Sequence, residues 1–135
     1  MINYELYTHT QTPELVTYVL LPYTWTEDIT TTSFVQARRV ASALMCIDDL
    51  NSVSEGNGAG TALLNAIAVW GMSRGLDKIT GSVVTRDGFY EALVKWYGKR
   101  GLSVQNGWLV GETSEVRDMT AEILHAHNVE YKIAT

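Results

Sequence analysis

The sequence predicts a mixed α/β fold with a mixed sheet, organised around a parallel pair of strands. An extended segment, a glycine-rich turn and an apolar helical segment follow one another between residues 35 and 74, and a second strand and helix follow over 78–101. A strand–helix–strand order of this kind places two strands parallel in one sheet. The 135 residues are 46% hydrophobic, which suits one core. We therefore expect residues 1–135 to form a single domain.

The first elements are predicted to be a strand and a helix. Residues 2–7 alternate well enough between polar and apolar side chains to indicate a strand. Residues 12–21 begin with a helix-start signal, because Thr12 suits the N-cap and Pro13 the first helical position. This segment is therefore predicted to be helical.

The middle of the chain is predicted to contain extended structure followed by a buried helix and a strand. Residues 35–50 favour extended structure, and two interpretations remain open: a turn near residues 38–39, or one long strand. A helix is predicted over 61–74, and its apolar residues cover more than one face, so it should be well buried. Residues 78–85 are predicted to form a strand parallel to the extended segment that ends near residue 50.

The remaining elements alternate between helices and strands. A second helix is predicted over 86–101, followed by a hairpin over 102–110. Asn106–Gly107 is the dipeptide that a type I′ turn prefers, so we place the hairpin turn there. A last helix over 114–127 and a strand over 129–133 complete the predicted order.

Composition excludes several classes of function. The net charge of −5 and the pI of about 5.1 argue against a broad nucleic-acid surface, and Lys95, Lys99 and Arg100 are interpreted as a solvated helix end. The single Cys46 excludes an internal disulfide and a cysteine-based metal site. The two histidines of 125–127 do not share a helix face, so no metal is expected. Without a signal peptide or a membrane span, we expect a cytoplasmic protein with no membrane or nucleic-acid partner.

Three glycines at alternate positions form the turn before the buried helix. Gly56, Gly58 and Gly60 have two open explanations: a tight turn, or a backbone left bare for a phosphate group. A Walker A loop is excluded, because the residues after Gly60 are Thr61 and Ala62 rather than Lys and Ser or Thr. A dinucleotide fingerprint is weak, because its glycine spacing differs.

Three motifs in the second half resemble those of the GNAT N-acetyltransferases. The segment EGNGAGTALL (55–64) is similar to the family's acyl-CoA loop, and SRGLDKITGSVV (73–84) is similar to the turn and strand that follow its helix. The segment VKWYGKRGL (94–102) resembles the family helix that ends in a tyrosine. The motifs occur in the family's order, so the resemblance implies a GNAT-like acyltransferase fold.

This resemblance implies acetyl-CoA as cosubstrate and an amine, in a small molecule or a protein, as acceptor. Main-chain donors at a helix N-terminus can hold a pyrophosphate without a basic side chain. The pantetheine arm is expected beside the strand residues from Asp49 to Val53. The residues implied in CoA binding are Asn51, Val53, Asn57, Gly58, Ala59, Gly60, Thr61 and Ala62.

The resemblance also implies catalytic residues. Tyr97 matches the tyrosine that protonates the departing thiolate in many members of the family. Asp48 and Asp49 lie on the strand that often supplies the general base. Adjacent strand residues point to opposite faces, so at most one of the two aspartates is expected to face the cleft. The alternatives are a Tyr97 that only packs beside Trp96, and aspartates that mark a strand end or a bulge.

One departure from the family pattern favours a second class of function. Glu55 stands where the family usually has Arg or Gln, and a carboxylate repels a pyrophosphate. The N-terminal 28 residues also look like those of small phage-encoded GNAT-like proteins, some of which are virion components. The alternative is therefore a non-catalytic interaction protein of the same fold, with a second copy of the chain or phage structural proteins as partners.

Overall fold

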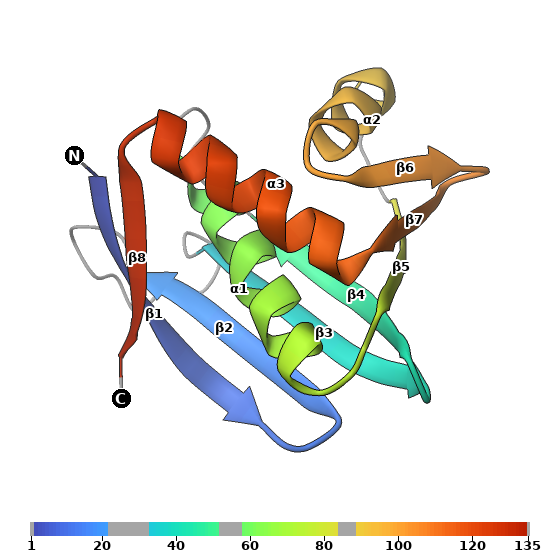
Figure 1. The fold of residues 1–135 in the computed structure, drawn as a ribbon, viewed down its shortest axis with the longest axis horizontal. Helices are drawn as coiled ribbons and strands as arrows, with labels where there is room; N and C mark the ends of the chain where they lie inside the picture. The colour runs from blue at the N-terminus through green and yellow to red at the C-terminus, as the bar shows by residue number, and fades with distance from the viewer. Residues whose placement is uncertain (1, 22–32, 52–57, 84–88, 135) are drawn as a thin grey trace.

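The computed structural model describes residues 2–21, 33–51, 58–83 and 89–134. In this part of the chain, eight strands form one sheet in the order β6-β7-β5-β4-β3-β2-β1-β8, with helices packed against it (Figure 1). The pairs β4–β5 and β1–β8 are parallel, and the other neighbours are antiparallel. The elements are β1 (Ile2–Gln11), β2 (Leu15–Leu21), β3 (Ser33–Ala41), β4 (Leu44–Asn51), α1 (Ala59–Ser73), β5 (Lys78–Ser82), α2 (Tyr90–Gly98), β6 (Leu102–Gln105), β7 (Trp108–Glu112), α3 (Thr113–Ala126) and β8 (Val129–Ala134).

Strand β2 replaces the helix predicted over residues 12–21, so that prediction is wrong. The Thr12 hydroxyl accepts hydrogen bonds from the backbone N–H groups of Glu14 and Leu15, at 3.2 and 3.1 Å. A threonine hydroxyl can bond to nearby backbone groups in a turn as well as at a helix N-cap, so the local signal was ambiguous. The apolar period in the segment is two, as its buried side chains show: Val16, Tyr18 and Leu20.

Strands β3 and β4 form a hairpin whose turn lies at residues 42–43, beyond both predicted possibilities. The two arginines at 38–39 remain in β3 because each finds a carboxylate there. Arg38 Nε lies 2.8 Å from Asp48 Oδ2, and Arg39 Nε lies 3.2 Å from Glu14 Oε2. Charged residues that suggested a turn are therefore paired across neighbouring segments of the sheet.

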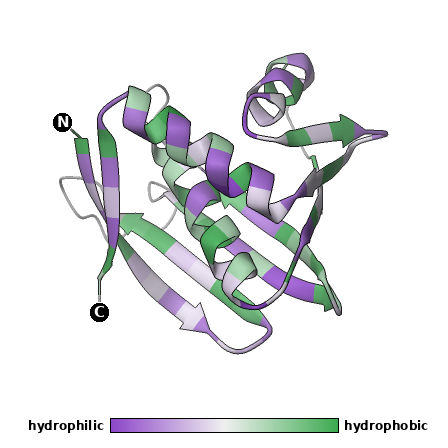
Figure 2. Ribbon diagram, in the orientation of Figure 1, coloured by the Kyte–Doolittle hydropathy of each residue, from purple (hydrophilic) through white to green (hydrophobic). Residues whose placement is uncertain are grey.

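Helix α1 is buried on almost its whole circumference, as its apolar composition predicted. It packs against β2, β3 and β4 on one side and against α3 on another (Figure 1). The α3 ribbon carries both hydrophilic and hydrophobic bands (Figure 2), and its buried residues form one stripe toward α1: Thr113, Val116, Thr120 and Leu124. Such a stripe is typical of a helix with one buried face.

The hairpin of β6 and β7 turns where the sequence predicted. Asn106 and Gly107 both have positive φ angles, 53° and 80°, as a type I′ turn requires. The Gly107 carbonyl oxygen also accepts a hydrogen bond from the Val83 N–H, at 2.8 Å. The turn is thereby tied to the end of β5. No helix among the described residues is long and apolar enough to cross a membrane.

One polar side chain joins α1, α3 and β8. Asn65 of α1 donates from Nδ2 to Thr120 Oγ1 at 2.9 Å and to the Arg117 carbonyl oxygen at 3.0 Å, both on α3. Its Oδ1 accepts a hydrogen bond from the Tyr131 hydroxyl of β8 at 2.5 Å. Because Asn65 is buried, these bonds replace water and fix how α3 and β8 sit on α1.

Replacing Asn65 should measurably destabilise the fold. In Asn65→Ala, the buried groups of Thr120 and Tyr131 lose a partner, and we expect a loss of about 2 kcal/mol in the free energy of unfolding. Val69→Ala, on the exposed side of the same helix, should cost less than about 0.5 kcal/mol. Urea denaturation followed by circular dichroism measures both. Equal losses would show that the polar bridge contributes nothing specific.

Stability should fall at alkaline pH partly through Tyr131. Burial raises the pKa of Tyr131 to about 12, with a smaller contribution from Tyr18, whereas an unfolded tyrosine titrates near pH 10. The folded protein therefore retains a proton that the unfolded chain loses, so this stabilisation is complete below pH 10 and is lost as the pH rises toward 12.

The Tyr131→Phe variant has no hydroxyl to titrate at this position, so its free energy of unfolding should fall less between pH 9 and pH 12 than that of the wild type. The wild type should lose up to roughly 2 kcal/mol more than the variant between pH 9 and pH 12. Urea denaturation at several pH values tests this expectation. If the free energies of unfolding of the two proteins fell in parallel with pH, separated only by the constant loss of the hydrogen bond to Asn65, this expectation would be contradicted.

Candidate functional site

The parallel strands β4 and β5 separate part-way along their length. Among the described residues, they pair only at Leu44↔Lys78, Met45↔Ile79 and Cys46↔Thr80, although β4 continues to Asn51. β5 remains paired with β7 on its other side up to Ser82. The Ile47 carbonyl oxygen still lies against Gly81 of β5, where a Cβ would be only 2.9 Å from it. The backbone groups of β4 beyond Ile47 have no ladder with the described residues of β5. An edge of this kind can pair with an extended ligand.

A β-bulge in β4 determines where the two candidate bases lie. Gln36 of β3 pairs with Asp49 and Ala37 pairs with Ile47, so Asp48 is the extra residue in β4. A bulge breaks the strict alternation of side chains and redirects them. Both aspartates are exposed as a result. The alternation argument, which expected them on opposite faces, does not apply here.

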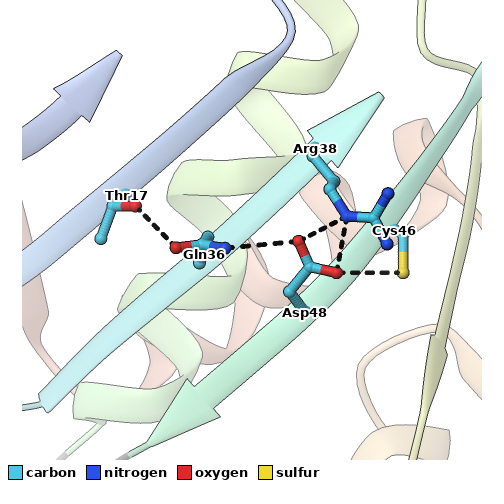
Figure 3. Close-up of polar contacts among 5 residues, drawn as sticks. All are labelled: Thr17, Gln36, Arg38, Cys46 and Asp48. Atoms are coloured by element: carbon cyan, nitrogen blue, oxygen red, sulfur yellow. Dashed lines mark hydrogen bonds and ion pairs between the residues drawn. The ribbon is translucent and has the colours of Figure 1, made fainter. Parts of the chain in front are cut away.

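Asp48 belongs to a polar network on the sheet surface (Figure 3). Its carboxylate accepts hydrogen bonds from Arg38 Nε at 2.9 and 2.8 Å, from Gln36 Nε2 at 3.4 Å and from Cys46 Sγ at 3.7 Å. Gln36 in turn accepts a hydrogen bond from Thr17 at 3.2 Å. The bond to Asp48 and its charge raise the pKa of Arg38. With its oxygens occupied in this way, Asp48 is a poor acceptor for a substrate proton.

Asp49 is the aspartate that acts on Tyr97. Burial raises the pKa of the Tyr97 hydroxyl, and the negative charge of Asp49 raises it further. Tyr97 also packs against the hydrophobic core and contacts Trp96 edge-to-face, with ring centroids 5.1 Å apart. A tyrosine with a raised pKa stays protonated at neutral pH, as a general acid must. Packing beside Trp96 and a role as acid are thus compatible.

The first turn of α1 is closely packed. Gly58, the N-cap, has φ +81°, and a Cβ placed on it would lie 3.0 Å from a methyl group of Val129 on β8. Glycine is therefore required there for steric reasons alone. The side chains of this turn are buried, and Ala62 packs with Leu124 and Val129. The tight-turn explanation holds for Gly58 whether or not a ligand binds.

The backbone N–H groups of this turn differ in whether they are free to donate a hydrogen bond to a ligand. The Ala62 N–H donates to the Gly58 carbonyl oxygen at 2.9 Å, which corrects the expectation that Ala62 supplies a free donor. The N–H groups of Ala59, Gly60 and Thr61 precede the first intrahelical bond and have no partner within the helix. Of the other residues expected to bind CoA, Asn51 ends β4, whereas Val53 and Asn57 lie outside the described residues, as do Glu55 and Gly56.

Arg100, interpreted from sequence as part of a solvated helix end, reaches this turn. Its Nε donates to Thr61 Oγ1 at 3.0 Å and its Nη1 to the Trp96 carbonyl oxygen at 2.9 Å. The guanidinium carbon lies 4.0 Å from the centre of the Trp96 ring. Lys95 and Lys99 are exposed, as expected. The only sequence signal that separates Arg100 from them is its place directly before the Gly101 turn.

A hollow of about 590 Å³ lies at the opposite end of α1, and its donors are already engaged. Arg39 donates to the carbonyl oxygens of Ser42 and Arg74. Arg74 donates to Ser73 Oγ and the Trp70 carbonyl oxygen. Arg39 Nε lies near Glu14 in an alignment that makes no hydrogen bond. These arginines hold the end of α1 in place. The residues that line the hollow are Gln11, Thr12, Pro13, Glu14, Arg39, Ser73 and Arg74.

No group of three or more potential ligand side chains is placed to hold a metal ion within the described ranges. A scan of protein-family models and a search of curated proteins gave no match for this sequence.

Solved structures are nevertheless similar to this chain. Nourseothricin acetyltransferase has a TM-score of 0.59 and 15% identity over 75% of this chain and 66% of its own. The PaiA N-acetyltransferase from Thermoplasma acidophilum, solved with coenzyme A, has a TM-score of 0.53 and 13% identity over 73% of this chain and 60% of its own. A cAMP-binding acyltransferase from Mycobacterium smegmatis has a TM-score of 0.55 and 14% identity over 85% of this chain and 39% of its own.

This chain has the GNAT acyltransferase fold. The fold predicted from the three motifs is thereby confirmed. The chain spans 39 to 66% of the length of the three proteins described above, and identities this low carry over the fold alone. A phage origin is not shown and stays a prediction.

The two aspartates should affect Tyr97 differently. Asp49→Asn removes the charge that raises the pKa of Tyr97, so that pKa should fall while burial keeps it above its ordinary value. Asp48→Asn should leave it unchanged, because that carboxylate is paired with Arg38. Carbon-13 NMR titration of ring-labelled tyrosine, with the Tyr97 signal assigned by Tyr97→Phe, measures both. Equal shifts in the two variants would refute this assignment.

Proposed function

We propose that this chain transfers an acetyl group from acetyl-CoA to an amine by direct attack. The observation that carries the proposal is the end of the β4–β5 ladder at Cys46 and Thr80, together with the effect of Asp49, further along β4, on the pKa of Tyr97. The GNAT fold supports it, since structures of this fold have been solved with coenzyme A. The acceptor is a small molecule or a protein that carries a primary amine.

Acetyl-CoA would lie in the opening with its two ends held differently. Its pantetheine arm pairs with the open edge of β4 from Asp49 to Asn51, and onward to Val53. Its pyrophosphate takes hydrogen bonds from the N–H groups of the first turn of α1, where the helix dipole favours an anion. This arrangement assigns the amides of Asn57, Gly58, Ala59, Gly60 and Thr61 to CoA binding.

Two side chains would move protons during the transfer. The neutral amine attacks the thioester carbon, and a C–N bond forms as its excess proton passes to the Asp49 carboxylate, directly or through a water. The C–S bond then breaks, and the Tyr97 hydroxyl gives its proton to the CoA sulfur. Solvent returns a proton to Tyr97 and removes one from Asp49, which restores the starting state.

A second candidate is a non-catalytic protein of the same fold that acts through contacts with other proteins, including a phage particle. The observation that favours it is the close packing of Val129 against Gly58, which explains this glycine without a ligand. In that case, the loop would retain its shape for the fold alone.

Binding and turnover separate the two candidates. Isothermal titration calorimetry with acetyl-CoA should give a micromolar Kd for an acetyltransferase, and no heat at millimolar ligand would leave only the non-catalytic candidate.

Tyr97→Phe should lower the rate of thiol release from acetyl-CoA, measured with a panel of primary amines, by about 100-fold with little change in Kd. Tyr90→Phe, which alters an exposed tyrosine of the same helix, should retain the wild-type rate. An unchanged rate in Tyr97→Phe would remove Tyr97 from the mechanism.

A further inference from the structure

Arg100 occupies an unusual electrostatic position. Its guanidinium lies at the N-terminal turn of α1, through the 3.0 Å bond to Thr61, and this end of a helix is itself positive. The side chain is also half-buried, which lowers its pKa because burial disfavours the charged form. A half-buried cation beside a positive helix end is unfavourable unless an anion joins it.

Three other arginines of the described chain form an ion pair with a carboxylate, whereas Arg74 and Arg100 form none. Arg74 is the C-cap of α1, where the helix dipole favours a cation, but Arg100 lies at the opposite end of that helix. Ion pairs join Arg38 to Asp48, Arg39 to Glu14 and Arg117 to Asp118. No described Asp or Glu lies within ion-pair distance of Arg100, whose contacts are the Thr61 hydroxyl, the Trp96 carbonyl oxygen and the Trp96 ring. Its charge is therefore not neutralised by the described part of the chain.

The contacts of Arg100 also leave hydrogen-bond donors unused. A guanidinium has five N–H donors, and Arg100 uses Nε for Thr61 and one N–H of Nη1 for Trp96. Both N–H groups of Nη2 and the second N–H of Nη1 have no described acceptor. The Trp96 ring holds the plane of the group, so the remaining donors are fixed in direction. A fixed fork of donors matches a phosphate group.

We propose that Arg100 binds the pyrophosphate of acetyl-CoA, across from the amides of the α1 first turn. This proposal rests on the proposed acetyltransferase function and adds a side chain to a site otherwise made of backbone. It gives the C-terminal end of α2 and the turn after it two tasks, because Tyr97 lies in the last turn of the helix and Arg100 follows directly after its C-cap. Trp96 and Thr61 position Arg100 for this contact.

The test compares ligands with and without phosphates. Calorimetry would measure the binding of acetyl-CoA, dephospho-CoA and acetyl-pantetheine to the wild type, Arg100→Gln and Lys99→Gln. Lys99→Gln is the matched control, because it removes the same charge from the neighbouring exposed residue. We expect Arg100→Gln to weaken acetyl-CoA and dephospho-CoA binding by 10- to 100-fold and to leave acetyl-pantetheine binding unchanged. Lys99→Gln should change each Kd by less than about threefold.

Each other result would overturn a defined part of the proposal. An equal loss of acetyl-pantetheine binding in Arg100→Gln would show that Arg100 only holds α2 in place. A loss with acetyl-CoA that disappears with dephospho-CoA would assign Arg100 to the 3′-phosphate instead of the pyrophosphate. Unchanged binding of all three ligands would refute the contact while leaving the acetyltransferase proposal intact. A wild type that binds none of them would refute both.

Discussion

The burial of α1 on almost its whole circumference is the constraint on which the rest of the structure depends. A helix enclosed by β2, β3 and β4 on one side and by α3 on another has no room for large side chains in its first turn, and its sequence there is Ala59, Gly60, Thr61 and Ala62. The same enclosure needs a second layer, which α3 and β8 supply through the hydrogen bonds of Asn65. The small residues that permit this packing are also those that leave the backbone amides bare. A glycine-rich helix start can therefore satisfy packing and anion binding at once.

The opening between β4 and β5 places chemistry next to that helix. Strands that separate part-way along a parallel pair leave one edge unpaired, and here the bulge at Asp48, in the ladder with β3, lies in the same stretch of β4. The bulge sends one aspartate into a surface ion pair with Arg38 and leaves the other to act on Tyr97. Tyr97, in the last turn of α2, responds to the charge of Asp49 on β4, and Arg100, directly after the C-cap of α2, bonds to Thr61 of α1. Tyr97 and Arg100 are three positions apart at the end of one short helix, so they cannot be positioned independently.

Local signals explain most of what the sequence predicted, and tertiary contacts explain what it missed. The buried helix, the Asn106–Gly107 turn and the order of the second half follow from spacing and turn chemistry, which neighbours in sequence determine. Strand β2 was missed because Thr12 bonds to the same backbone groups in a turn as at a helix start. The bulge at Asp48 depends on register with β3, and the Arg100–Thr61 bond joins residues far apart in sequence. Neither has a local signature.

The parallel pairing of β1 with β8 has a consequence for how the site is assembled. β1 precedes every other described element along the chain, yet its partner on this edge, β8, follows all of them. The Val129 methyl groups that pack on Gly58 arrive with the same late strand. Contacts so distant along the chain form slowly, because a long loop must close before they are gained. The turn at the start of α1 therefore reaches its final packing only after β8 has been made and has docked beside β1, so the candidate site cannot mature before these two distant strands meet.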